Sequence, residues 1–181
     1  TMLAVAGGES AWTLATENFN YTKAGLAKLW PGKFANSPEL QQKYAGNPGN
    51  ILPEFVYGYD TNIGKQLGNK LPGDGTKYIG RGYIGLTGRH LYTIFSKMLY
   101  DKGFISSPTL LVDNPDAINQ NPEIGAAVVV IYFLWHPRLQ EANKNPDAYY
   151  VEKGIKAVGI CVDYIYKRKK ELYECFLGQL K

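Results

Sequence analysis

The amino-acid sequence predicts a mainly α-helical protein with at most a very small β element. Apolar residues recur at helical spacing in several segments, and capping residues or prolines stand where those segments begin. A third observation is the glycine-rich stretch 73–92, which indicates a tightly turning loop. The 181 residues, 45% of them hydrophobic, suit a single domain over 1–181 with two lobes. The abrupt apolar start suggests that this domain is the C-terminal part of a longer protein.

The first half is expected to hold short helices, each introduced by a cap, a proline or an apolar run: 2–9, 22–29, 37–44 and 50–57. Thr22 is the expected cap of the second, which Pro31 and Gly32 stop. A turn is expected over 46–49. The following residues are expected to form a long loop, 58–76, and a short strand, 77–79.

The second half is predicted to contain longer helices. One begins at Thr87 or Gly88 and reaches about Tyr100, with one apolar face made of Leu91, Ile94, Phe95, Met98 and Leu99. After a polar connection, an apolar helix starts at Pro122 and runs to Trp135. Two further helices are expected over 145–158 and 162–180.

Composition narrows the classes of partner. A net charge of +4 is too small to indicate nucleic acid, although it suits work near a polyanion such as a cell wall. An ordinary soluble surface explains it equally well. No apolar run reaches the roughly 20 residues that a membrane span needs, and no signal peptide is visible.

No metal site and no cofactor are expected. The two histidines, His90 and His136, are far apart in sequence, and the two cysteines form no CxxC motif. A continuous helix would hold Cys161 and Cys175 about 21 Å apart, which is too far for a disulfide. We therefore expect two free thiols.

Two glutamates near the N-terminus are candidates for acid/base chemistry. Glu9 follows a run of small apolar residues and two glycines, so a partly apolar setting would keep it protonated as an acid requires. Glu17 opens the segment E-N-F-N-Y. A pair of carboxylates flanking a cleft is the equipment of glycoside hydrolysis. Taken alone, each glutamate is more often a surface charge.

The combination of three segments is more specific. The order G-G-E-S-x-W, E-N-F-N-Y and G-D-G-x-K-Y-x-G-R-G-Y-I-x-L-T-G-R-x-x-Y resembles the family 19 glycoside hydrolases, in particular their phage endolysin and chitinase-like branch. The resemblance covers residues 3–92 and is looser over the last third. It implies a lysozyme-like α+β fold with two lobes around a cleft.

The resemblance also implies roles for individual residues. Glu9 matches the general acid, Thr87 the hydroxyl that holds the attacking water, and Glu17 the partner carboxylate. Plant-type members take this second glutamate from a later position. Three further residues match positions that line the cleft or brace the acids: Tyr21, Arg81 and Tyr83. Inversion would place the two carboxyls about 6.5–9.5 Å apart, whereas a continuous helix would separate residues 9 and 17 by about 12 Å along its axis.

Several positions depart from the family pattern, and they keep alternatives open. A glycine replaces histidine at Gly8 and glutamine at Gly85, and Leu91 replaces asparagine. Ala11 and Trp12 also differ. The leading interpretation is a muramidase-type lysin that cleaves β-1,4 bonds of peptidoglycan. The alternatives are a chitinase, a catalytically inactive wall-binding or phage structural domain, and a lytic transglycosylase. We expect a phage-encoded monomer that acts on the host cell wall.

Overall fold

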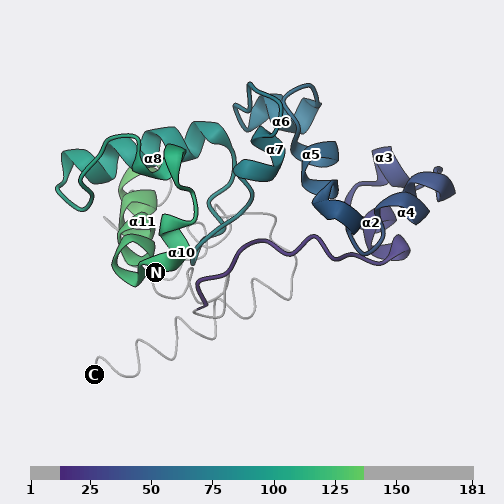
Figure 1. Ribbon diagram of the computed structural model, residues 1–181, viewed down its shortest axis with the longest axis horizontal. Coiled ribbons are helices and arrows are strands. Elements are labelled where there is room, and N and C mark those ends of the chain that lie inside the picture. Colours follow the sequence, from purple (N-terminus) through teal and green to yellow (C-terminus); the bar gives the residue numbers. More distant parts are fainter. Residues whose placement is uncertain (1–12, 137–181) are drawn as a thin grey trace, which may run out of the picture. The chain divides into compact units, whose positions relative to one another are not determined.

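The computed structural model describes residues 13–136, which are helical apart from loops and two isolated β-bridges. The predicted fold class, mainly α with a very small β element, is confirmed (Figure 1). The chain divides into two compact units. Within the described residues, the Glu17 unit contains 17–79 and 87–91, and the Arg81 unit contains 13–16, 80–86 and 92–136. The single-domain assignment over 1–181 stays a prediction.

The first helices of the Glu17 unit include the three predicted ones, whose starts lie within two residues of those predicted. The helices are α2 (Lys23–Leu29), α3 (Pro31–Phe34), α4 (Pro38–Tyr44), a 3₁₀ turn (Pro48–Asn50) and α5 (Leu52–Tyr57). Helix α3 was not predicted; of the predicted caps, Thr22 makes a side-chain hydrogen bond and Ser37 makes none. Thr22 caps α2 by accepting a hydrogen bond from the backbone N–H of Gly25 at 3.1 Å. Pro31 does more than stop that helix, because it stands at the first position of α3.

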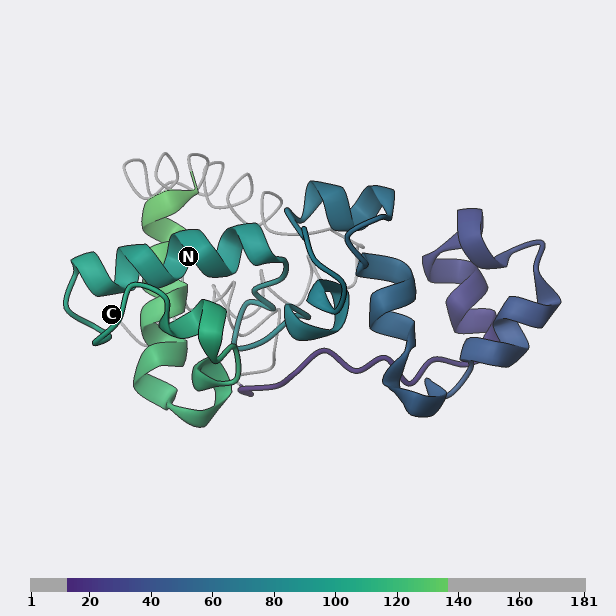
Figure 2. The ribbon, with the colours of Figure 1, turned by 45° about the horizontal axis from the view of Figure 1, so that its top comes forward.

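The core of the Glu17 unit lies among these short helices, which gather together in both views (Figures 1 and 2). Its members are 0–8% exposed: Phe19, Leu26, Phe34, Tyr44, Leu52, Val56 and Ile79. Burying one side chain of this kind stabilises the fold by about 1.5–3 kcal/mol. The core therefore fixes the segment after Glu17 through Phe19.

Residues 58–76 correct the prediction of a long loop. They contain α6 (Asn62–Gln66) and the start of α7 (Asp74–Lys77), and Lys77 is therefore helical, so the predicted strand over 77–79 is wrong. Side chains complete these one-turn helices. Thr61 caps α6 by accepting from Gly64 at 2.9 Å, and Glu54 accepts from backbone N–H groups at the start of α7.

In its described part, the Arg81 unit contains two longer helices and two of one turn. The longer ones are α8 (Arg89–Asp101, whose first three residues belong to the Glu17 unit) and α11 (Pro122–Trp135), and those of one turn are α9 (Leu110–Asp113) and α10 (Ala117–Gln120). The predicted ends of α11 are right, and Asn121 caps it by accepting from Glu123 and Ile124. The polar connection after α8 contains the short helices α9 and α10, which were not predicted.

Helix α8 crosses α11 in both views (Figures 1 and 2), and aromatic rings join the two helices. The ring of Phe95 lies 6.1 Å from that of Tyr132 and 5.6 Å from that of Trp135. The buried residues of α8 are Tyr92, Phe95, Ser96 and Leu99. The predicted apolar face is therefore confirmed in part, since Leu91, Ile94 and Met98 are only half-buried.

Other predictions fall outside the described residues: the helices over 2–9, 145–158 and 162–180, and both cysteines. Between residues 13 and 136, no helix has the length and apolar character that crossing a membrane requires. Within the same range, no three metal-ligating side chains of His, Cys, Asp or Glu gather into a candidate site.

Candidate active site

Glu17 lies in an extended segment, and its carboxylate is held by a tyrosine. The chain from 13 to 21 contains no helix, so the helical separation considered for residues 9 and 17 does not apply at Glu17. The hydroxyl of Tyr57, at the end of α5, donates a 2.9 Å hydrogen bond to Oε1 of Glu17. Glu17 is half-buried, and this bond restricts the direction in which its carboxylate points.

Aromatic rings surround this pair. Phe19 lies edge-on to Tyr57 with ring centroids 5.6 Å apart, and it stacks parallel to Trp30 at 6.4 Å. Tyr21 meets Trp30 edge-on at 5.4 Å. Burial, and then the charge of Glu17, raise the pKa of the Tyr21 hydroxyl above its ordinary value of 10.0. The carboxylate and the two tyrosine hydroxyls thus share one partly apolar environment.

Tyr57 is a fixed donor to Glu17. Burial raises the pKa of the Tyr57 hydroxyl most, and the charge and hydrogen bond of Glu17 raise it further. The phenol therefore stays protonated throughout the range in which proteins work. Its backbone carbonyl accepts a 2.7 Å hydrogen bond from the side-chain amide of Asn69, which is 4% exposed.

Thr87 belongs to the same unit and stands immediately before a tight corner. Gly88 has φ +88°, and an added Cβ would lie 2.6 Å from the carbonyl oxygen of Leu67. The N–H of Gly88 donates to the carbonyl of Tyr78 at 2.8 Å. The next N–H, that of Arg89, donates to Oδ1 of Asn69 at 2.9 Å. One buried amide side chain, Asn69, therefore holds both the end of α5 and the corner after Thr87.

The corner is anchored by a charged pair. Arg89 binds Asp74 with two nitrogens, Nε at 2.7 Å and Nη2 at 2.5 Å, and its guanidinium lies 4.8 Å from the ring centre of Tyr78. Burial acts to raise the pKa of Asp74. The hydrogen bonds from Arg89 and from the N–H groups of Lys70 and Leu71 outweigh it, so the pKa lies below its ordinary value.

Arg81 lies in the other unit, where it is 7% exposed. Its Nε donates to Asp116 at 2.7 Å and its Nη1 to the hydroxyl of Tyr92 at 3.1 Å. Burial lowers the pKa of Arg81, but Tyr92 and Asp116 raise it more, so the guanidinium stays charged. The carboxylate recorded beside this arginine is thus Asp116, which the sequence analysis did not single out.

The glycine-rich turn after Arg81 is closed by backbone hydrogen bonds. Arg81 and Leu86 exchange two of them, at 3.2 and 2.9 Å. Gly82, with φ +76°, donates to the carbonyl of Ala15 and to the side chain of Asn119. Asn119 also donates to the hydroxyl of Thr16 at 2.9 Å. Thr16, one residue before Glu17, is therefore tied to this turn.

The remaining predicted residues lie on or near this turn. Tyr83 is half-buried, and a Cβ at Gly125 of α11 would meet its ring edge at 3.5 Å. Gly85 is exposed with φ +61° and open space around it. At this position, where the family resemblance expects a glutamine, a side chain starting from an added Cβ would meet no heavy atom within 4 Å.

The structure describes five of the six predicted site residues and divides them between the two units. Glu17, Tyr21 and Thr87 belong to the Glu17 unit, and Arg81 and Tyr83 to the Arg81 unit. Glu9, the predicted acid, lies outside the described residues. Glu17 and Tyr21 lie close enough that, besides burial, the charge of Glu17 raises the pKa of Tyr21. The ring of Phe19 contacts both Tyr21 and Tyr57, the partner of Glu17.

Sequence reasoning missed three residues that support these groups: Tyr57, Asn69 and Asp116. Tyr57 was placed only as a helix end, and its bond to Glu17 spans 40 residues. Asn69 fell in the supposed loop. A buried asparagine has no pattern of its own in a single sequence, whereas the arginine that needs Asp116 was visible in the G-R-G element.

No protein-family model matches the chain. The chain is similar to a protein of Haemophilus influenzae (strain ATCC 51907 / DSM 11121 / KW20 / Rd) named as a glycosyl hydrolase family 19 domain-containing protein, with 36% identity over 98 residues. The matched part is 54% of this chain and 46% of that protein, so the chain spans about half the length of the relative. The likeness supports the resemblance to family 19, while the phage endolysin branch stays a prediction.

Proposed function

We propose that the protein is a glycoside hydrolase that cleaves β-1,4 bonds in the glycan strands of bacterial peptidoglycan. The similarity to a family 19 domain-containing protein supports the reaction class. The observation that carries the proposal here is the oriented carboxylate of Glu17, held by a tyrosine hydroxyl among aromatic rings. Aromatic rings suit sugar faces, and phenol hydroxyls suit sugar hydroxyls.

In this proposal Glu9 protonates the leaving oxygen and Glu17 activates a water that Thr87 helps to hold. The reaction inverts the configuration at the sugar carbon. Tyr21 and Tyr83 contact the substrate. Arg81, whose guanidinium is engaged by Asp116 and Tyr92, contributes by holding the turn that carries Tyr83. The protein acts on the host cell wall as a phage-encoded lysin.

The decisive experiment is mass spectrometry of the products from purified murein sacculi and, in parallel, from colloidal chitin. Soluble muropeptides with reducing N-acetylmuramic ends support the proposal. Release from chitin alone identifies a chitinase, and anhydro-muramic ends identify a lytic transglycosylase. Binding to sacculi without any product defeats the enzyme and favours a wall-binding domain.

The two glutamates are tested separately. Glu9→Gln and Glu17→Gln should each lower the rate by at least about 100-fold, the scale of a lost acid or base, with unchanged circular dichroism. Glu39→Gln, an exposed carboxylate on α4, is the matched control and should keep full activity. Full activity of Glu17→Gln would show that the second catalytic carboxylate is another residue, later in the chain.

Tyr57→Phe separates positioning from mere packing. The substitution keeps the ring contact with Phe19 and removes only the donor to Glu17. We expect a fall in kcat of about tenfold with little change in KM, because about 1.4 kcal/mol of orientation is lost from the reacting group. Unchanged kcat would show that the bond serves stability alone.

A further inference from the structure

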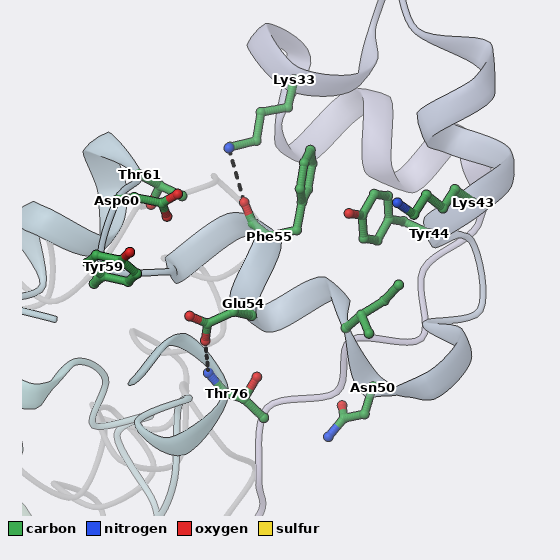
Figure 3. Close-up of a pocket in the computed structure, with 11 residues that line it drawn as sticks. Lys33, Lys43, Tyr44, Asn50, Glu54, Phe55, Tyr59, Asp60, Thr61 and Thr76 are labelled. Atoms are coloured by element: carbon green, nitrogen blue, oxygen red, sulfur yellow. Dashed lines mark hydrogen bonds between the residues drawn. The ribbon is translucent and has the colours of Figure 1, made fainter. Parts of the chain in front are cut away.

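A pocket of about 670 Å³ opens in the Glu17 unit (Figure 3). It is lined by residues of α3, α4, α5, the 3₁₀ turn and the segment 59–61, together with Thr76 of α7. None of the predicted site residues that the structure describes lines it. The pocket is therefore separate from the described residues of the predicted active site.

One of the four charged side chains in the pocket wall already has a structural task. Glu54 accepts from the N–H of Gly73 at 3.0 Å with one oxygen and from the N–H of Thr76 at 3.1 Å with the other. Its charge thus meets the N-terminal turn of α7, where backbone N–H groups lack helical partners. Figure 3 shows the bond to Thr76. Lys33, Lys43 and Asp60 remain.

Lys33 is held in place in the pocket wall. Its ammonium donates a 3.1 Å hydrogen bond to the carbonyl of Phe55 and lies 4.6 Å from the centre of the Phe55 ring. That ring stacks on Tyr44 with centroids 4.3 Å apart (Figure 3). An ammonium has three donors, so this arrangement orients the charge while leaving donors for a ligand. Because the Lys33 side chain is already ordered, a ligand loses less binding free energy to the entropic cost of immobilising it.

The other two charges stand at the pocket without a recorded ion pair. Lys43 has its ammonium 5.3 Å from the ring centre of Tyr44, and Asp60 is exposed. In the described part of the chain, the recorded ion pairs all join other residues. The pocket wall therefore carries two cations and two anions, and of the two anions Glu54 is already engaged by backbone N–H groups. Ile51 and Tyr59, each 41% exposed, add apolar surface.

We propose that this pocket binds an acidic peptide, with carboxylates on Lys33 and Lys43, an amino group on Asp60, and aliphatic stems against Ile51 and Tyr59. A stacked sugar fits less well, because the Phe55 ring is already engaged by Tyr44 and Lys33. Resting on the proposed function, the peptide is the one attached to peptidoglycan glycan strands, which carries carboxylates and amino groups. The pocket then makes the enzyme prefer peptide-bearing strands.

The test measures binding of a synthetic stem tripeptide, containing one glutamate and one diamino acid, to the full 181-residue chain by calorimetry or NMR titration. Lys43→Met and Asp60→Asn should each weaken binding about tenfold, the scale of one charge-assisted hydrogen bond. Lys33→Met should do the same but also loses a bond to Phe55, so its folding is checked by thermal melting. Lys28→Met, an exposed lysine on α2 away from the pocket, is the matched control.

Two outcomes overturn the proposal: the wild-type chain does not bind the tripeptide, or the Lys43 and Asp60 variants bind it as tightly as wild type. Binding of a chito-oligosaccharide that Lys43→Met weakens, without any binding of the tripeptide, would assign the pocket to sugar. Because the tripeptide contains no glycosidic bond, its binding is independent of hydrolysis. A chain that binds it but releases no sugar would retain this site and lose the proposed function.

Discussion

The G-R-G and T-G-R elements each contain an arginine that pairs with an aspartate, and the two ion pairs differ in which member is buried. Arg89 is the more exposed member of its pair, with side-chain exposures of 22% for Arg89 and 3% for Asp74. In the Arg81 pair the arginine is buried at 8% and Asp116 is 57% exposed. A buried charge that loses its partner is costly, whereas an exposed one regains water. Similar motifs therefore place the vulnerable charge on different residues.

The largest expected effect comes from Arg89→Met. It leaves the buried carboxylate of Asp74 without its bidentate partner, which should lower the free energy of unfolding by about 3–5 kcal/mol. Urea denaturation measures the change. Lys97→Met is the control, because it breaks the exposed pair with Asp101 and should cost no more than about 1 kcal/mol. Equal losses in the two variants would break the comparison.

The pH dependence of stability should trace to Asp74. Its pKa is lower in the folded chain than the ordinary 3.8, so its stabilising contribution is complete above that value and is lost as pH falls through the lower folded value. Asp74→Asn should therefore flatten the acid limb of a plot of unfolding free energy against pH. Parallel limbs for wild type and variant would contradict the assignment.

Alanine substitutions at Gly82, Gly85 and Gly88 compare the turn after Arg81 with the corner after Thr87. Gly85→Ala, with open space around it, should cost only the backbone strain of a positive φ, about 1–2 kcal/mol. Gly82→Ala adds a contact at 2.6 Å with a methyl of Ile118, and Gly88→Ala one at 2.6 Å with the backbone of Leu67. Each should lower the free energy of unfolding by about 1–3 kcal/mol more than Gly85→Ala does. The loss should be larger for Gly88→Ala, because the backbone of Leu67 cannot rotate away as the side chain of Ile118 can. Thermal or urea unfolding of the three variants gives the order.

The smallest effect is expected from Asp116→Asn. The amide can still accept from Arg81, the guanidinium keeps its bond to Tyr92, and the site of the lost charge faces water. Because Asn keeps an acceptor for the buried guanidinium, the loss should be about 1 kcal/mol, below that of Arg89→Met, which removes both hydrogen bonds from the side chain to the buried Asp74. A loss as large as that of Arg89→Met would mean that buried Arg81 needs the charge of Asp116 and not only a hydrogen-bond acceptor.

Sequence reasoning placed helices well where the chemistry is local. The beginnings of α2, α4 and α11 depend on a capping residue or proline within a few positions, and the printed sequence displays them. It failed for α6 and α7, since one-turn helices have no periodicity and are completed by distant groups such as Glu54.

The same limit applies to the candidate site. Glu17 could be selected from E-N-F-N-Y, but Tyr57, 40 residues on, could not be identified as its partner. Likewise, the arginine of G-R-G indicated a need for an acid without naming Asp116, 35 residues away. The residue types in the sequence indicate which chemistry is present, but the hydrogen-bond partners of Glu17 and Arg81 are identified by the folded structure.

The bond between Asn119 and Thr16 has a consequence for how the protein is made. The contacts that shape the corner after Thr87 join residues 12 to 22 positions apart, as with Asn69 and Tyr57 or Glu54 and Thr76. Such short loops close early in folding. Asn119 and Thr16 are 103 positions apart. During synthesis, Thr16 therefore cannot form this bond until α10, which contains Asn119, has been made. Thr16, next to the catalytic candidate Glu17, therefore gains its bond to Asn119 after the residues that shape the corner have all been synthesised.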